Sequence, residues 1–384
     1  MKLFYLLYFA ATGVYFPYVG LYYRAIHLDG VQIGLAASLV PLGGVALQPL
    51  WGMLSDRFGW RKPLLVLSLL AASIAAPLVT LAHSFATLLP LVAVMAITIS
   101  PAVPLSDATT LDALSTRGGS YGGVRVYGSL GFLLSSLAVG SFYRGRGIFA
   151  IFIVYGILLF GAFLVSLWSP RQTTVVTEAR GEGIAQVLTD RVVVIFLLLA
   201  VMGYGTFAAY NTFFPLYLRS LGAGTNVVGL ASGLASLSEL PVMALAGTVV
   251  ARVGVKPLML AGLGAAALRW LAYGLLRDYH LVLAFQLLHG LSFAGFYVAG
   301  VTFMDRRVPA RLRSTGQTVF NAATFGLGSV AGSNLFGVLF DRLHAGGMFF
   351  VAGVIAAAAI LGMVLLVPNL GAEQRLARGP ASSS

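Results

Sequence analysis

The 384-residue sequence has no cysteine and few charged side chains. Without cysteine, neither a disulfide nor a thiolate metal site can form. Only 9% of the residues are charged, whereas soluble domains carry about a quarter. Apolar residues make up 59% of the chain, and the mean hydropathy is +0.91. Because no water-soluble fold can cover so much apolar surface, this composition predicts a multi-pass membrane protein.

Histidine is also scarce and scattered, and no nucleotide-binding loop is present. The sequence therefore predicts neither a metal site nor a cofactor, and no G-x-x-x-x-G-K-[ST] motif suggests that ATP hydrolysis drives the protein. The net charge of +12 would suggest nucleic acid in a soluble chain, but the cations lie in short loops between apolar runs. We therefore expect a lipid bilayer as the partner, and no nucleic acid. The five histidines are His27, His83, His280, His289 and His344.

Apolar runs of about 20 residues, the length that crosses a ~30 Å hydrocarbon core, recur along the chain. The first run follows Lys2 without a cleavage site, so we interpret it as a span and not as a signal peptide. Sixteen of the 24 lysines and arginines fall on the side that holds both ends of the chain and six on the other, which predicts cytoplasmic termini. The twelve predicted transmembrane helices are 3–26, 32–54, 63–82, 86–113, 124–143, 148–168, 192–218, 226–250, 257–276, 280–304, 315–339 and 346–367.

The spans divide into two similar sets of six. A shift of 195 residues aligns 24–61 with 219–256 without a gap and matches ten identical residues in 38 positions, several of them glycine or arginine. We therefore predict two homologous six-helix halves, as in many secondary carriers, with the solute site between them. The predicted parts are the N-terminal half 1–168, a cytoplasmic linker 169–191, the C-terminal half 192–368 and a disordered cytoplasmic tail 369–384.

The loop after the second span reads Gly52-Met-Leu-Ser-Asp-Arg-Phe-Gly-Trp-Arg-Lys62. This run resembles the G-x-L-x-D-R-x-G-x-R/K-R/K signature of the major facilitator superfamily. Its glycines allow helices to approach closely, and its aspartate can pair with an arginine or cap a helix. The alternative is a merely solvated basic loop. We assign a conformational role to Gly52, Asp56, Arg57, Gly59 and Arg61; the second copy has Ala251 at the position of Asp56.

Nearly the whole chain resembles the lactose permease type of oligosaccharide/proton symporter and the related phenylpropionate permease-like branch. The resemblance places Asp107 at a sugar-binding glutamate and Arg125 at its partner arginine. Glu239, Arg269 and His289 match the proton-coupling network. Tyr210-Asn211 and the run from Gln286 to Gly290 are more similar to the phenylpropionate branch. Four departures weigh against galactoside recognition: Phe132 replaces a tryptophan, Val242 an asparagine, Gln286 a lysine, and Ser292 the glutamate that carries the proton.

Asp107, Arg125, Glu239, Arg269 and His289 all fall within predicted spans. A charge there costs about 2.5–3.5 kcal/mol and needs a partner or water. We interpret Asp107 and Arg125 as a solute-binding clamp, and Glu239, Arg269 and His289 as the proton-coupling group. The alternatives are a structural ion pair for the first two and a packing role for His289. Asp112 and Asp305, close to cytoplasmic span ends, are interpreted as loop or helix-cap residues. Further solute contacts are assigned to Tyr15, Phe132, Tyr210 and Asn211.

These observations predict a major facilitator protein that moves a small organic solute together with protons by alternating access, as a monomer in the cell inner membrane. The solute classes are aromatic acids, sugars and nucleosides. One alternative is proton-coupled efflux, although span 5 lacks the Gly-Pro pattern of drug antiporters. An intramembrane enzyme is disfavoured because no nucleophile is paired with a base. A receptor or scaffold would not need buried charges in both halves.

Overall fold

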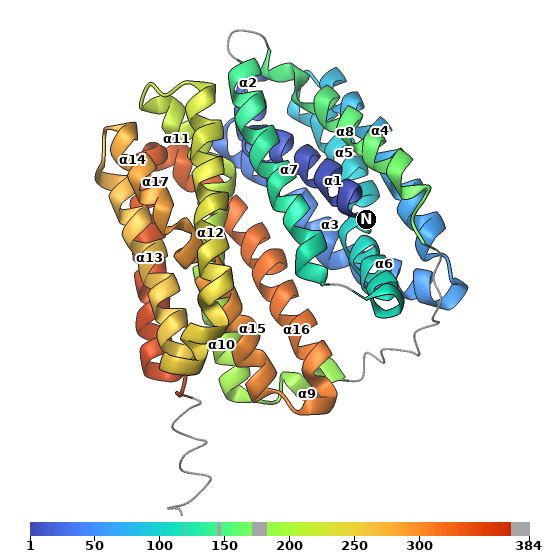
Figure 1. Ribbon diagram of the computed structural model, residues 1–384. Helices are drawn as coiled ribbons and strands as arrows, with labels where there is room; N and C mark the ends of the chain where they lie inside the picture. The colour runs from blue at the N-terminus through green and yellow to red at the C-terminus, as the bar shows by residue number, and fades with distance from the viewer. Residues whose placement is uncertain (119, 144–146, 171–182, 370–384) are drawn as a thin grey trace, which may run out of the picture. The chain divides into compact units, whose positions relative to one another are not determined.

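The computed structural model describes residues 1–118, 120–143, 147–170 and 183–369, and these form helices joined by short turns, with no strand (Figure 1). Most of the predicted linker and all of the predicted tail except residue 369 lie outside the described residues. The helices are α1 (Lys2–Tyr15), α2 (Val19–Ala25), α3 (Gly30–Phe58), α4 (Arg61–Leu78), α5 (Phe85–Ile99), α6 (Ala102–Arg117), α7 (Tyr121–Phe142), α8 (Ile151–Ser166), α9 (Ile184–Val187), α10 (Arg191–Ala208), α11 (Phe214–Ser220), α12 (Thr225–Val253), α13 (Val255–Leu275), α14 (Tyr279–Phe285), α15 (Phe296–Arg307), α16 (Arg313–Asn321) and α17 (Ser329–Leu366).

Eleven helical stretches among the described residues are long and apolar enough to cross a membrane. The all-helical, multi-pass architecture predicted from composition is thus confirmed. The last stretch, Ala310–Leu366, has 57 residues and covers two of the predicted spans. A straight helix of that length would measure about 85 Å at 1.5 Å per residue. Within it, His344 has φ 55° and ψ 177°, which are not helical angles, so the helix breaks there.

Three helical regions contain π-helical turns: η4 (Ala209–Phe213), η6 (Leu291–Gly295) and η8 (Ala322–Gly328). A π turn carries an extra residue per turn and often lies at functional positions in a helix. η4 lies between α10 and α11, η6 precedes α15, and η8 joins α16 to α17. All three belong to the second of the two predicted halves.

The contacts group the described residues into two compact units. Unit 1 holds those within Met1–Ala179, Tyr210–Gly233 and Ser333–Ala345, and unit 2 holds those within Arg180–Ala209, Leu234–Gly332 and Gly346–Ser384. Unit 1 therefore combines the first six predicted spans with end segments of later helices. The six-plus-six division of the sequence stays a prediction.

Glycine allows two of these end segments to pack closely within unit 1. A Cβ on Gly34 of α3 would lie 2.2 Å from the carbonyl oxygen of Ser333 in α17, and one on Gly229 of α12 would lie 2.4 Å from that of Ser136 in α7. Real Cβ atoms do not approach so closely, so both positions need glycine. Gly34 and Gly229 are 195 residues apart, the shift of the sequence repeat.

The repeat also shows in the arginines that follow the first span of each half. Nη1 of Arg24 donates to the carbonyl of Leu28 at 3.0 Å, and Nη1 of Arg219 donates to that of Ala223 at 3.2 Å. Both the donors and the acceptors are 195 residues apart. Each arginine thus satisfies a carbonyl just past the end of its helix, where backbone acceptors have no helical partner.

Candidate functional site

The carboxylate of Asp107 lies against α1 in unit 1. The hydroxyl of Tyr5 in α1 donates to Oδ1 of Asp107 in α6 at 2.5 Å. Tyr5 is fully buried and Asp107 is half-buried. A hydrogen bond to an ionised carboxylate is about twice as strong as one between neutral groups. The sequence prediction did not include Tyr5, because nothing in the sequence indicates which face of the first span meets α6.

Arg125 in α7 stacks on an aromatic ring of the same helix α1. Its guanidinium carbon lies 3.8 Å above the ring centroid of Phe9 and 5.8 Å from that of Tyr5. A Cβ at Gly128 would lie 2.7 Å from Nη1 of Arg125 and 2.8 Å from Phe9. Gly128 therefore provides the space in which the guanidinium stacks, a role that the sequence prediction missed.

Asp107 and Arg125 do not form the ion pair that a structural lock between their helices would require. Among the described residues Arg125 makes no hydrogen bond or ion pair, and its contacts are with aromatic faces. Arg125 is half-buried. A half-buried guanidinium with five N–H donors and no acceptor can bind a carboxylate or hydroxyls of a solute.

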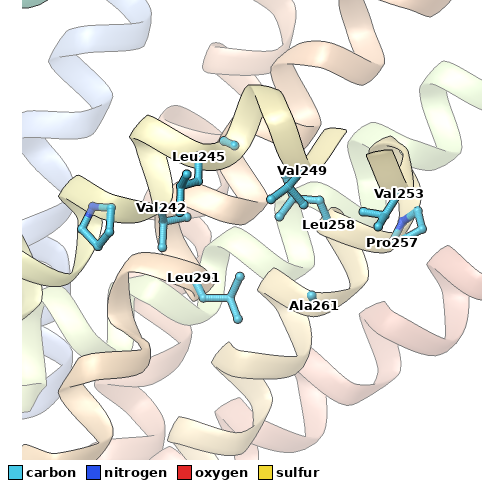
Figure 2. Close-up of a pocket in the computed structure, with 10 residues that line it drawn as sticks. Val242, Leu245, Val249, Val253, Pro257, Leu258, Ala261 and Leu291 are labelled. Atoms are coloured by element: carbon cyan, nitrogen blue, oxygen red, sulfur yellow. The ribbon is translucent and has the colours of Figure 1, made fainter. Parts of the chain in front are cut away.

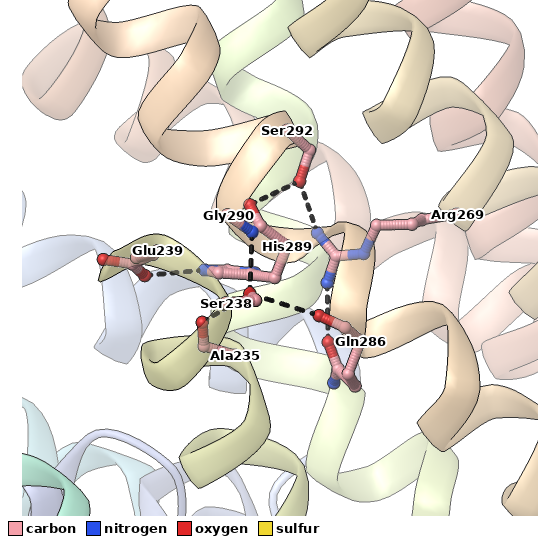
Figure 3. Close-up of polar contacts among 8 residues, drawn as sticks. All are labelled: Ala235, Ser238, Glu239, Arg269, Gln286, His289, Gly290 and Ser292. Atoms are coloured by element: carbon pink, nitrogen blue, oxygen red, sulfur yellow. Dashed lines mark hydrogen bonds and ion pairs between the residues drawn. The ribbon is translucent and has the colours of Figure 1, made fainter. Parts of the chain in front are cut away.

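In unit 2, Glu239 and His289 form a direct pair (Figure 3). Oε1 of Glu239 in α12 lies 3.1 Å from Nε2 of His289, which follows η5 (Gln286–Leu288). The glutamate side chain is 25% exposed and the histidine side chain 8% exposed. Both groups exchange protons, so the pair can take up, share and release one within a membrane span.

Arg269 in α13 lies beside this pair and is completely buried (Figure 3). Nη1 donates to the hydroxyl of Ser292 at 2.7 Å, and Nη2 donates to Oε1 of Gln286 at 2.7 Å. The guanidinium also stacks on Trp270, with its carbon 4.7 Å from the ring centroid. Gln286 and Ser292 thus both bind Arg269. They are two of the four residues that depart from the lactose permease pattern.

Irregular backbone places these polar groups. Between α14 and α15 the chain passes through the 3-10 turn η5 and the π turn η6, which carries Ser292. At Gly290 a Cβ would lie 1.9 Å from the carbonyl oxygen of Ser238, so only glycine fits between this segment and α12. The amide of Gly290 donates to the hydroxyl of Ser238 at 2.8 Å. This contact brings His289 next to Glu239.

The remaining predicted solute contacts lie elsewhere. Tyr15 is 5% exposed and stacks on Tyr155 of α8 at 4.9 Å between centroids, so its ring packs inside unit 1. Phe132 is half-buried on α7. Tyr210 and Asn211 lie in the π turn η4, where Asn211 is exposed and the ring of Tyr210 lies 4.8 Å from that of Phe214.

The loop signature forms a tight turn between α3 and α4. Gly59 has φ 64° and ends α3 in the left-handed conformation, as a glycine after a helix commonly does. Arg61, 4% exposed, pairs with Asp112 of α6. Arg57 stacks on Phe58, the space around Gly52 is open, and the side chain of Asp56 lies outside the described residues. Asp112 lies inside α6 and pairs with Arg61, so the prediction that it is a loop or cap residue is wrong.

A separate apolar cavity of about 430 Å³ lies in unit 2 (Figure 2). Val242, Leu245 and Val249 of α12 line it opposite Leu258 of α13. No polar side chain lines this cavity, so it offers a polar solute no hydrogen bond. Among the described residues, no group of three or more histidine or acidic side chains could hold a metal ion.

Known proteins resemble the chain over almost its whole length. The model of the MFS_1 like family matches residues 1–351. The "Maltose permease" of Geobacillus stearothermophilus is 30% identical over 95% of this chain and 93% of its own length. The "Probable 3-phenylpropionic acid transporter" of Escherichia coli (strain K12) is 26% identical over 95% of this chain and 97% of its own. The crystal structure of the nucleoside transporter NupG superposes with a TM-score of 0.87 over 95% of this chain and 97% of that one, at 16% identity.

Proposed function

Because the chain belongs to the MFS_1-like family of major facilitator transporters, which are not enzymes, we propose that it is a proton-coupled symporter of a small organic solute. It acts by alternating access in the cell inner membrane, with twelve spans, cytoplasmic termini and a monomeric state. The observation that carries the proposal is the pair of Glu239 and His289 at 3.1 Å inside a span, beside the buried charge of Arg269.

Asp107 and Arg125 bind the solute. The guanidinium of Arg125 has its donors available, and the aromatic rings of Phe9 and Tyr5 hold it in place by cation–π contacts. Asp107 accepts from Tyr5 and has further lone pairs for a hydroxyl or amine of the solute. The transporters named above act on a sugar, an aromatic acid and nucleosides, and these classes are the candidates here.

Glu239 and His289 carry the proton. Ser292 stands where the resemblance to the lactose permease type implies the proton-carrying glutamate, so we assign this role to Glu239 of α12, which pairs with His289. Arg269 is held by the neutral groups of Gln286 and Ser292 and keeps its charge in the span.

Coupling follows from the cost of charge inside the bilayer. When Glu239 is protonated, the pair carries less charge and the conformational change requires less dehydration of ions. After the change, the proton leaves to the other side and the solute dissociates from Arg125. The imposed gradient thus sets the direction of net transport.

The test is uptake by reconstituted vesicles. An imposed pH gradient, acidic outside, should drive accumulation of a solute from a panel of aromatic acids, sugars and nucleosides. Glu239→Gln should lower accumulation at least tenfold, while exchange of solute across the membrane without a gradient continues. Asp278→Asn is the matched control, because this exposed carboxylate caps α14 outside the spans.

Accumulation that persists in Glu239→Gln would overturn the assignment of the proton carrier. Uptake that ignores the gradient in the unaltered protein would overturn coupling altogether. If the gradient instead drives the solute out of vesicles that are acidic outside, the protein is an exporter, and the symport proposal is wrong.

A further inference from the structure

The carboxylate of Asp341 in α17 binds the first turn of α3, a segment 311 residues earlier in the chain. The backbone amide of Gly30 donates to Oδ1 of Asp341 at 2.7 Å, and the amide of Val31 donates to Oδ2 at 3.0 Å. The first amides of a helix have no acceptor within the helix, so both oxygens of the carboxylate satisfy amides that need a partner. A negative charge is also stabilised at this end of a helix. We refer to this contact as the Asp341 cap.

The Asp341 cap completes a close crossing of α3 and α17 within unit 1. A Cβ on Gly30 would lie 2.5 Å from the carbonyl oxygen of Gly337, and one on Gly337 would lie 2.4 Å from that of Gly30. Ser333, Gly337 and Asp341 are spaced four residues apart, so they lie on one face of α17. The two backbones therefore touch beside the cap, and this packing fixes the position of the carboxylate.

The crossing of α7 and α12, which is the counterpart in the sequence repeat, is held by a weaker polar contact. The hydroxyl of Thr225, which stands 195 residues after Gly30, donates to the carbonyl of Gly140 at 3.0 Å. Four residues past Gly140 the sequence has Arg144, which lies outside the described residues and whose side chain has no acceptor for an amide. Hydrogen bonds to a carboxylate are about twice as strong as bonds between neutral groups. Polar contacts among the described residues therefore hold α3 to α17 more strongly than α7 to α12.

Two strained residues lie on either side of the Asp341 cap. His27 precedes α3 with φ 66°, and His344 follows Asp341 with φ 55°. Among the described residues, these are the two positions with a positive φ that are not glycine. Strained backbone persists only where surrounding contacts hold it, and it is common at switch regions. The strain therefore marks these helix ends as a place where contacts hold the backbone in one of its possible arrangements.

The Asp341 cap can also be broken and remade. Asp341 and Val31 are both exposed, and on the predicted topology these helix ends face the outside of the cell. When the two helices separate, water can replace each partner in the hydrogen bonds, so the net free energy of the contact is modest. A contact of this strength suits a step that is repeated in every transport cycle.

We propose that the Asp341 cap keeps the outer ends of α3 and α17 together, and that its release limits the opening of the outer side. The inference rests on the proposed alternating access and names a residue that controls it. Asp341 is a positioning residue, because it acts on the position of α3 and not on the solute or the proton. Loss of the cap should make the crossing open more often, even when no solute is present.

Thiol labelling of the full-length protein tests the proposal, because the chain has no cysteine and an introduced one reports alone. Ser333→Cys places the reporter at the crossing, where the serine is 3% exposed. In right-side-out vesicles without solute or a pH gradient, a membrane-impermeant maleimide added outside should label S333C slowly. Asp341→Asn should raise this rate about threefold to tenfold, because it removes the charge at the helix N-terminus. Asp341→Glu retains the carboxylate and should raise the rate less.

Asp29→Asn is the matched control at the same end of α3. Its carboxylate accepts from the amide of Gln32 at 2.8 Å and so caps its own helix. Asparagine caps a helix about as well as aspartate, so labelling of S333C should change by less than about twofold. Thr225→Val removes the neutral bond at the other crossing and should raise the rate at S333C less than Asp341→Asn does. A larger effect of Thr225→Val would show that the α7–α12 crossing limits opening, and the proposal would be wrong.

A second variant and a second reporter guard against poor folding. Val31→Pro removes one of the two amides and leaves the charge of Asp341, and proline is tolerated in the first turn of a helix. It should raise labelling of S333C about threefold. Ser73→Cys reports from inside α4, where the serine is 7% exposed, and should stay unlabelled in Asp341→Asn. An equal rise at S73C would mean that the fold loosens in general, which overturns the proposal.

Unchanged labelling of S333C in both Asp341→Asn and Val31→Pro would also overturn the proposal. So would an equal rise in Asp29→Asn, because the effect would then come from charge at the helix end and not from the contact with α17. All these rates are measured without solute or a gradient. A failure of proton-driven uptake in the unaltered protein would therefore overturn the proposed function and leave the test of the Asp341 cap intact.

Discussion

The two predicted halves each have an arginine and a carboxylate within a predicted span, but they arrange them differently. Arg125 stacks on Phe9, is half-buried and makes no hydrogen bond among the described residues. Arg269 is fully buried and donates to Gln286 and Ser292. The first guanidinium has donors available for a ligand, whereas the second is part of a fixed network. The comparison fits the proposed roles, in which Arg125 binds solute and Arg269 supplies a fixed charge.

The largest difference should appear in stability. Arg269→Leu leaves the acceptor of Gln286 and the hydroxyl of Ser292 without their donor in a buried site, so it should lower the free energy of unfolding by about 3 kcal/mol. Arg125→Leu loses only a cation–π contact and should cost less than about 1 kcal/mol. Thermal unfolding of both variants in the same detergent measures the contrast. Equal destabilisation would contradict the division of roles.

The space beside Arg125 offers a smaller test. Gly128→Ala introduces a methyl group 2.7 Å from Nη1 of Arg125, so the guanidinium must leave the ring of Phe9. Overpacking of this kind costs about 1–3 kcal/mol, and we expect uptake at low solute concentration to fall about tenfold. Gly247→Ala in the other half is the control, because no atom lies within 4 Å of its added Cβ. If both variants transport normally, Arg125 does not bind solute in this position.

The hydrogen bond to Asp107 should have a moderate effect. Tyr5→Phe removes the donor that lies 2.5 Å from Oδ1, which corresponds to about 1 kcal/mol or a fivefold higher half-saturation concentration. Tyr8→Phe is the control on the same helix, since its hydroxyl does not bond to Asp107 in the described chain. Transport assays over a range of solute concentrations compare the two. A higher half-saturation concentration in Tyr8→Phe alone would reverse the assignment.

The smallest effect concerns the ion pairs at helix ends, Arg61 with Asp112 in the first half and Arg307 with Asp190 in the second. Partial burial alone would raise the pKa of Asp190, but hydrogen bonds from Arg307 and backbone amides lower it below its ordinary value. The stabilisation is therefore complete above the unfolded pKa of about 3.9 and disappears as the pH falls through the folded pKa. Asp190→Asn should lower the unfolding midpoint slightly at pH 7, and this difference should shrink as the pH falls below about 3.9. A difference that stays constant as the pH falls would show that the charge is not its source.

Apolar composition and the lengths of the apolar runs were enough to predict the helical membrane fold. They were also enough to single out Glu239 and His289, which the structure brings together. Partners far apart in sequence were not predictable: Tyr5 and Asp107 are 102 residues apart, and Arg61 and Asp112 are 51 apart. Hydrophobic spans do not show which face of one helix meets another.

Tyr15 also shows that the sequence does not reveal which side chains meet. As an aromatic residue on the first span it was a candidate solute contact, yet its ring stacks on Tyr155. Aromatic residues pack against each other as readily as against a ligand. The positive φ of His27 was also not visible in the sequence, although its repeat mate Gly222 adopts the same left-handed region at φ 84°. Only the comparison of the two copies shows that His27 occupies a position suited to glycine.

The π turns have a mechanical consequence. Each π turn interrupts the regular hydrogen-bond pattern of its helix, because it holds one residue more than a turn of α-helix. A π turn can shift along its helix when a few backbone hydrogen bonds exchange partners. Each such shift rotates the side chains of the residues that enter or leave the turn. η6 begins two residues after His289 and carries Ser292. Movement of this defect by a single residue would turn that hydroxyl away from Arg269 while the helix on either side stays intact.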